Sequence, residues 1–143
     1  MMMQVPLEVI AAVMELVPVP CSLIELEARV SEGLPASALL VCVESVTVSV
    51  KVQRTLLAQI SSKVIYRRDM RQLTRDESEK TERLARVLAA ALHIWGNLSD
   101  ARQYLATPHM LLNGQTPLDV VLTELGALRV EELLWTLFYG LPA

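Results

Sequence analysis

The longest uninterrupted amphipathic pattern in the sequence begins at Thr74, and it constrains the fold more than any other feature. Thr74 is followed three positions later by Glu77, which is the spacing of a helix capping box. Apolar residues then recur at intervals of three and four between Leu84 and Trp95, until Gly96 interrupts the pattern. The segment predicts one long helix whose apolar stripe has to be buried against other elements.

An earlier helix is predicted between Ser22 and Gly33. Ser22 has Glu25 three positions later, and Gly33 stands where a helix C-cap belongs. Residues 1–30 as a whole are expected to form a helical N-terminal extension.

Shorter helices are predicted after the long one. Ser99 should cap a helix that ends at Leu105, because Pro108 disfavours helical geometry in the residue before it. Thr116 and Pro117 should begin another, because proline at the first helical position loses no intrahelical hydrogen bond.

Two glycines are expected to end the last two helices, Gly126 the first of them and Gly140 the second. The apolar stripes of these two helices are Leu118, Val121, Leu122 and Leu125 in the first and Val130, Leu133, Leu134, Leu137 and Phe138 in the second.

One stretch departs from the helical pattern. Valines alternate with polar residues between Val46 and Val52, which is the period of a half-buried strand. No second segment of comparable strength could pair with it, and a lone strand would leave its backbone hydrogen-bonding groups without partners. We therefore favour a helix-turn-helix around Ser49, although helix, turn and strand all stay open for this stretch. The predicted fold class is all-α.

The composition favours a chain with a permanent partner. Hydrophobic residues make up 52% of the sequence and charged residues only 20%, and an excess of apolar surface usually marks an interface. No stretch reaches the ~18 uncharged residues that a membrane span requires, and the N-terminus lacks the basic start of a secretory signal. We expect a cytoplasmic protein that does not associate with membranes.

Basic residues concentrate between Lys51 and Arg75. This segment has seven basic residues and one acidic residue, a net charge of +6, whereas the rest of the chain carries −9. Such asymmetry indicates a segment that faces nucleic acid. A solvated helix face accounts for the charge equally well.

The sequence predicts no enzyme. His93 and His109 are far apart, and neither they nor Cys21 and Cys42 have companion ligands at metal-binding spacing. The motifs of serine hydrolases, zinc proteases, P-loop proteins and dinucleotide-binding proteins are absent. We therefore expect no catalytic residues, no metal and no cofactor.

The most specific pattern lies between Gly96 and Gly140. It reads W-G-N-L-S-D-A-R-Q-Y-L, A-T-P-H-M-L-L-N-G-Q-T-P-L-D-V-V, T-E-L-G-A-L-R-V-E-E-L-L and F-Y-G. This resembles the C-terminal toxin-binding domain of the Xre/MbcA/ParS antitoxins, whose pattern is G-x(n)-A-x-x-W/Y-L-x-x-P, L-x-G-x-T-P-L-x-x-L, G-x-x-x-V-x-x-L-L and a tyrosine- or histidine-glycine pair. A generic helical bundle would share the apolar positions but has no reason to contain N-G-Q-T-P-L-D.

The upstream half resembles the helix-turn-helix unit of the same family. E-G-L-P-A-S-A-L at residues 32–39 looks like its start, and the helix equivalent to Ser61–Arg68 reads DNA in that family. V-T-V-S-V and L-L-A-Q-I-S depart from the usual Leu-Gly-Leu-Ser entry and Leu-Leu-Gly-Ile-Ser turn. The implied domains are 1–30 as the extension, 31–73 as a divergent Xre-like helix-turn-helix, and 74–143 as the linking helix and toxin-binding domain.

The resemblance implies an antitoxin whose partner is a RES-domain toxin, an enzyme that degrades NAD or transfers its ADP-ribose moiety. The C-terminal domain would cover the NAD-binding cleft, and the antitoxin would form a homodimer within a hetero-oligomeric complex. The implied toxin contacts are Leu111, Leu112, Asn113, Gly114, Gln115, Tyr139, Gly140 and Leu141. The implied contacts to operator DNA are Arg54, Lys63, Tyr66, Arg67 and Arg68.

Other interpretations stay open. Fold maintenance explains the loop residues as well as binding does, because Gly114 and Pro117 would shape a turn in either case. The chain could also be a stand-alone helix-turn-helix regulator, or a helical adaptor without a toxin. A downstream gene for a RES-like protein would distinguish these classes.

Overall fold

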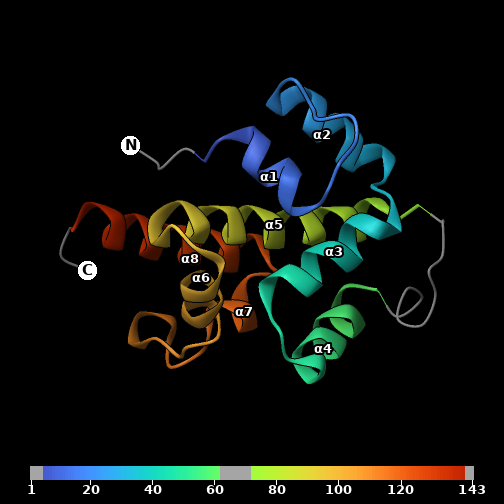
Figure 1. Ribbon diagram of the computed structural model, residues 1–143. Coiled ribbons are helices and arrows are strands. Elements are labelled where there is room, and N and C mark those ends of the chain that lie inside the picture. Colours follow the sequence, from blue (N-terminus) through green and yellow to red (C-terminus); the bar gives the residue numbers. More distant parts are fainter. Residues whose placement is uncertain (1–4, 62–71, 141–143) are drawn as a thin grey trace.

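A computed structural model describes residues 5–61 and 72–140 (Figure 1). Within these ranges the regular structure is helical, and the only β-type pairing is an isolated bridge between Pro35 and Gln72. The all-α prediction is confirmed. The elements are α1 (Leu7–Val13), α2 (Leu23–Glu32), α3 (Ala36–Val46), α4 (Val50–Ile60), α5 (Arg75–Trp95), α6 (Leu98–Leu105), the 3₁₀-helix η1 (Met110–Leu112), α7 (Pro117–Val120) and α8 (Glu124–Tyr139).

The long helix predicted from Thr74 is α5, and the rest of the fold is built around it (Figure 1). Its capping box is complete, because Glu77 N donates to Thr74 Oγ1 at 3.2 Å and Thr74 N donates to Glu77 Oε1 at 2.8 Å. Helices from both halves of the chain pack against α5, namely α1, α2, α3, α4, α6 and α8. The apolar stripe is therefore covered from several sides, and Leu84 and Leu88 are fully buried.

Several predicted boundaries are confirmed. Ser22 caps α2 by accepting a hydrogen bond from Glu25 N at 3.1 Å, and Gly33 follows its last turn. Thr116 forms a capping box with Asp119, with Pro117 at the first helical position of α7. These caps depend on short-range hydrogen bonds, which the sequence displays directly.

Two predicted boundaries are wrong. Asn97, not Ser99, caps α6, because its side-chain oxygen accepts a hydrogen bond from Asp100 N at 2.8 Å. Gly126 does not end a helix: α7 stops at Val120, and Gly126 is buried in the first turn of α8. Leu125, assigned to the earlier stripe, is exposed on α8.

Gly126 is needed for a close approach between two backbones. A Cβ atom at this position would lie 1.6 Å from the carbonyl oxygen of Val120 and 2.7 Å from Thr123 Oγ1. Thr123 caps α8 by accepting a hydrogen bond from Gly126 N at 2.9 Å. The glycine thus allows α8 to start directly over the end of α7.

The valine-rich stretch forms a helix-turn-helix, as favoured. Val46 is the last residue of α3, and Ser49 caps α4. Val46 is buried, whereas Val48 and Val50 are exposed, so the alternation in the sequence does not correspond to a strand face.

The two halves of the chain are also joined near Gly33. Leu73 N donates to Leu34 O and Leu34 N donates to Ser78 Oγ, both at 2.8 Å. These bonds connect the start of α3 with the start of α5. In the ranges that the structure describes, no helix has the length and apolar character needed to cross a membrane.

Candidate functional site

The loop between α6 and α7 is closed by its own hydrogen bonds. His109 N donates to Gln115 O at 3.1 Å, and Gly114 N donates to His109 O at 3.0 Å. His109 Nδ1 accepts a hydrogen bond from Leu111 N at 3.2 Å, which caps η1. Hydrogen bonds within residues 109–115 therefore give the loop a defined shape.

Asn113 and Gly114 give this loop its sharp reversal. Both have left-handed backbones, with φ of 57° and 78°. A Cβ atom at Gly114 would meet nothing within 4 Å, so conformation and not space favours glycine there. Asparagine is among the few residues that adopt this conformation readily. Asn113, Gly114 and Gln115 are exposed, as contact residues have to be.

The three apolar residues of η1 have different environments. Met110 is 88% exposed and Leu111 is 48% exposed, whereas Leu112 is 1% exposed. Leu112 is thus a core residue that anchors the loop, although the sequence resemblance grouped it with the contacts. Met110, which the sequence prediction did not include, is the most exposed of the three.

The second predicted segment lies at the end of α8. Leu137 and Phe138 were expected in the buried stripe, but both are exposed, and Tyr139 is 53% exposed. Gly140 follows with a φ of 65° and caps the helix, so it orients the end of the segment. Leu141 lies outside the described residues.

Aromatic contacts hold this end of α8 together and connect it to α5. The ring centroids of Phe138 and Tyr139 are 5.0 Å apart, and those of Trp135 and Tyr139 are 5.7 Å apart, both edge to face. His93 of α5 lies 5.3 Å from Phe138. Such arrangements favour a fixed orientation of the rings. An apolar surface with a preorganised shape is thus available for a partner.

A second aromatic pair lies where α5 ends and α6 begins. Trp95 at the end of α5 lies 5.9 Å from Tyr104 of α6, and Trp95 and Leu98 are both partly exposed. Burial raises the pKa of Tyr104, so this side chain stays a neutral phenol. We call the exposed residues Leu137, Phe138 and Tyr139 of α8 the aromatic end.

Two arginines attach the C-terminal helices to their neighbours. Arg83 of α5 donates to Glu124 Oε2 and to Leu122 O, both at 3.0 Å. Arg102 of α6 donates to Ser45 O at 2.8 Å, at the end of α3. These contacts fix α6 and α8 relative to the rest of the chain.

The turn between α3 and α4 is stabilised by hydrogen bonds of side chains. Thr47 Oγ1 accepts a hydrogen bond from Ser49 N at 3.1 Å, and Gln53 Nε2 donates to Thr47 O at 2.8 Å. Ser49 Oγ accepts from Val52 N at 3.3 Å. These bonds give a physical reason why V-T-V-S-V can replace the family's usual entry.

Only one predicted DNA contact lies in the described part of this unit. Arg54 is exposed on α4, one turn after the exposed Lys51. Lys63, Tyr66, Arg67 and Arg68 lie outside the described residues.

Among the described residues, no three histidine, cysteine, aspartate or glutamate side chains are grouped so that they could hold a metal ion.

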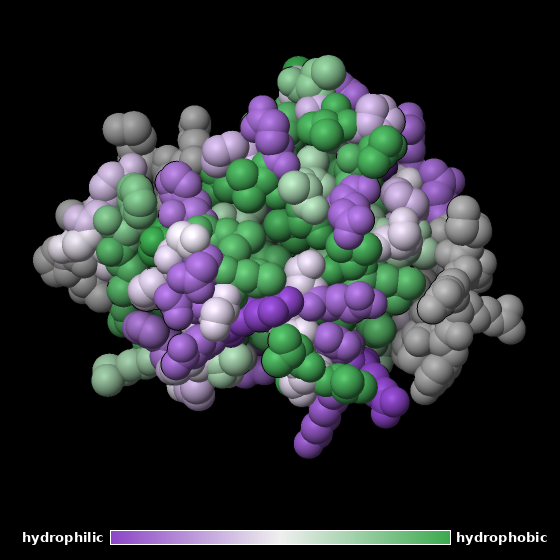
Figure 2. All heavy atoms as spheres, viewed as in Figure 1, coloured by the Kyte–Doolittle hydropathy of each residue, from purple (hydrophilic) through white to green (hydrophobic). Residues whose placement is uncertain are grey.

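Hydrophobic residues are exposed among polar ones on the face of the molecule that Figure 2 shows.

Two family models match the chain in consecutive segments. Residues 25–86 match the antitoxin Xre-like helix-turn-helix domain, and residues 90–140 match the antitoxin Xre/MbcA/ParS C-terminal toxin-binding domain. The chain is also similar to the antitoxin Xre of Pseudomonas putida, with 28% identity over 116 residues, which cover 81% of this chain and 72% of that protein. The helix-turn-helix around Ser49 and the helical unit after α5 occupy these two segments in that order. The chain therefore belongs to the Xre/MbcA/ParS antitoxin family, as an antitoxin with a helix-turn-helix domain.

Proposed function

We propose that this antitoxin neutralises a RES-domain toxin by covering the toxin's NAD-binding cleft with its C-terminal domain. The observation that carries the proposal is the match of residues 90–140 to a toxin-binding domain, combined with the exposed apolar side chains of that segment. Exposed apolar patches on a folded protein mark interaction surfaces. The mechanism is steric, so it requires no catalytic group in the antitoxin.

Two surfaces of the domain suit this role. Met110 and Leu111 project from a loop with a closed hydrogen-bond network, and Tyr139 belongs to the aromatic end. The ring of Tyr139 has few rotatable bonds and loses little conformational freedom on binding, and aromatic residues are common among the dominant contacts of interfaces. Asn113, Gly114 and Gln115 would add polar contacts around Leu111.

Co-expression with the candidate toxin followed by size-exclusion chromatography tests the complex. We expect the two proteins to elute together, because a permanent interface buries roughly 2,000 Å² or more. A homodimer of the antitoxin inside this complex would appear as a stoichiometry with two antitoxin chains. Separate elution of the toxin from an equal amount of folded antitoxin would contradict the proposal.

A second function, repression of its own operon in the cytoplasm, is favoured by the helix-turn-helix. The exposed Arg54 and Lys51 on α4 provide positive charge beside the turn, and phosphate contacts of this kind position a protein on DNA. The described residues account for only part of the basic segment. A gel-shift experiment with the DNA upstream of the gene, at two salt concentrations, tests this function.

A further inference from the structure

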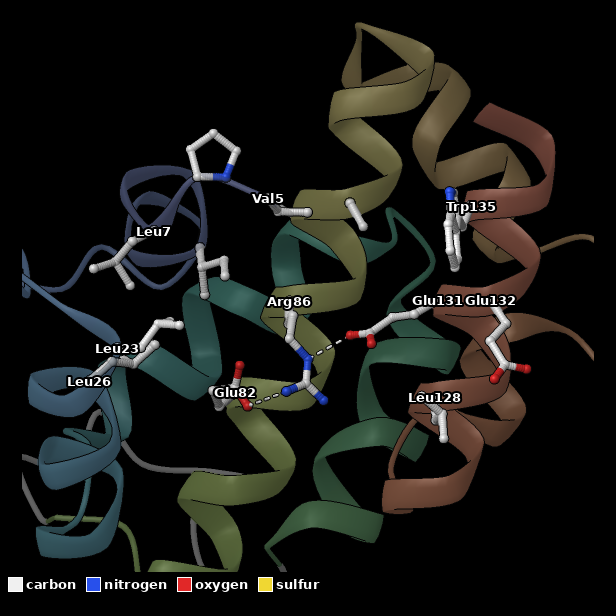
Figure 3. Close-up of a pocket in the computed structure, with 13 residues that line it drawn as sticks. Val5, Leu7, Leu23, Leu26, Glu82, Arg86, Leu128, Glu131, Glu132 and Trp135 are labelled. Atoms are coloured by element: carbon white, nitrogen blue, oxygen red, sulfur yellow. Dashed lines mark ion pairs between the residues drawn. The ribbon is translucent and has the colours of Figure 1, made fainter. Parts of the chain in front are cut away.

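A pocket of about 760 Å³ lies between the N-terminal helices and α8, along one side of α5 (Figure 3). Its apolar walls include Leu7 from α1, Leu23 and Leu26 from α2, and Leu128 and Trp135 from α8. Sites for small molecules have volumes of roughly 300–1,000 Å³ and are mostly apolar with a few polar groups. The pocket has the size and the lining of such a site.

Arg86 is the central polar group of the pocket, and it lies between two carboxyl groups (Figure 3). Its Nη1 atom is 3.5 Å from Glu82 Oε1, and its Nε atom is 2.6 Å from Glu131 Oε1. Both atoms of the second contact are buried, and their short separation makes them a close ion pair. The Arg86–Glu131 pair is thus the charged centre of the pocket.

The charges that line the pocket are unbalanced. Its described lining holds three carboxyl groups, those of Glu82, Glu131 and Glu132, and the single guanidinium of Arg86. Burial raises the pKa of Glu82 and of Glu131, so the nearby arginine does not fully offset the cost of burying their charges. A further positive charge in the pocket would complement them, and it would interact more strongly there than in bulk water.

Residues outside both matched domains complete this pocket. Val5, Pro6, Leu7, Ile10 and Leu23 precede residue 25, where the helix-turn-helix match begins. The opposite wall, from Leu128 to Trp135, belongs to the C-terminal domain. A bound molecule would therefore touch both the N-terminal helices and α8.

We propose that this pocket binds a small apolar molecule with a cationic head group, such as an alkylamine or arylamine. The ammonium group would lie beside Glu131 and Glu82, and the apolar part would contact Leu7, Leu26 and Trp135. The volume of the pocket, about 760 Å³, lies within the range of sites for small molecules and therefore favours such a ligand.

The chain offers a specific fluorescence reporter for the test. It has two tryptophans, and Trp95→Phe leaves Trp135 in the pocket wall as the only one. This variant is titrated at neutral pH with n-octylamine, n-octanol and n-octanoate, which share one apolar chain and differ in the head group. We expect a saturable change with octylamine, at a Kd about tenfold lower than with octanoate. The Trp135→Phe variant, with Trp95 as its only tryptophan, should not respond.

Two glutamine variants test the assigned head-group site in the same background. Glu131→Gln should bring the affinity for octylamine down to that for octanol, whereas Glu27→Gln, at an exposed position of α2 outside the pocket lining, should leave it unchanged. Circular dichroism checks that each variant is folded. Octanoate binding as tightly as octylamine, an unresponsive Trp135, or a folded Glu131→Gln protein that still prefers the amine would each overturn the proposal.

Discussion

Substitution of Gly126 by alanine changes both helix propensity and backbone packing. These two effects change the free energy of unfolding in opposite directions. In an ordinary helix, alanine in place of glycine stabilises by about 1 kcal/mol. Here the new Cβ atom would lie 1.6 Å from Val120 O, although such contacts essentially never fall below 3.0 Å. The start of α8 would have to move by about 1.4 Å relative to the end of α7.

The clash should outweigh the gain in helix propensity. Overpacking costs typically 1–3 kcal/mol, and weakening the Thr123 cap would add about 1 kcal/mol. After subtraction of the gain in helix propensity, we expect Gly126→Ala to lower the free energy of unfolding by roughly 1–3 kcal/mol, measured by urea unfolding followed by circular dichroism.

Gly114→Ala is the matched control for this measurement. Nothing lies within 4 Å of a Cβ atom at Gly114, but its φ is +78°, so only backbone strain of about 1–2 kcal/mol is expected. A Gly126→Ala protein as stable as the wild type, or more stable, would refute the close-approach explanation and restore helix propensity as the dominant effect.

Three further changes test other parts of the account. Tyr139→Ala should weaken toxin binding by about 2 kcal/mol or more in calorimetry, and Gln103→Ala on the exposed side of α6 should have little effect; equal losses would argue against an aromatic anchor. Arg54→Ala should reduce the slope of log affinity for DNA against log salt by about 0.9, with Arg129→Ala on α8 as the unaffected control. Burial raises the pKa of Glu82 above its ordinary 4.5, so the folded chain binds this proton at a higher pH than the unfolded chain does. Wild-type stability relative to Glu82→Gln should therefore increase as the pH is lowered from 7 toward 4.5, and a constant difference in urea melts would contradict the shift.

The helix starts were predictable where their signals are local. Thr74 and Thr116 each have an acidic residue three positions later, and both form capping boxes. A side chain and a backbone N–H three residues apart meet whatever the rest of the fold does. The same reasoning chose Ser99 over Asn97 wrongly, because both residue types cap helices and the sequence alone does not rank them.

Features that depend on tertiary packing were not predictable from local patterns. Gly126 looks like a helix end, but its role is set by the distance between Val120 O and the first turn of α8. Likewise, Leu112 is buried and its neighbour Met110 is exposed, which follows from the orientation of η1 on α8. The pocket around Arg86 is lined by helices from the start, the middle and the end of the chain, so no motif indicated it.

Toxin activity in the presence of the antitoxin tests the central claim most directly. The candidate RES-domain toxin is incubated with NAD, and NAD consumption is followed as the antitoxin is added. Steric coverage of the cleft predicts that consumption falls to the background level near an equimolar ratio, and that added NAD competes with the antitoxin. Undiminished NAD consumption in a complex that forms stably would contradict it, because the C-terminal domain would then bind the toxin without closing its active site.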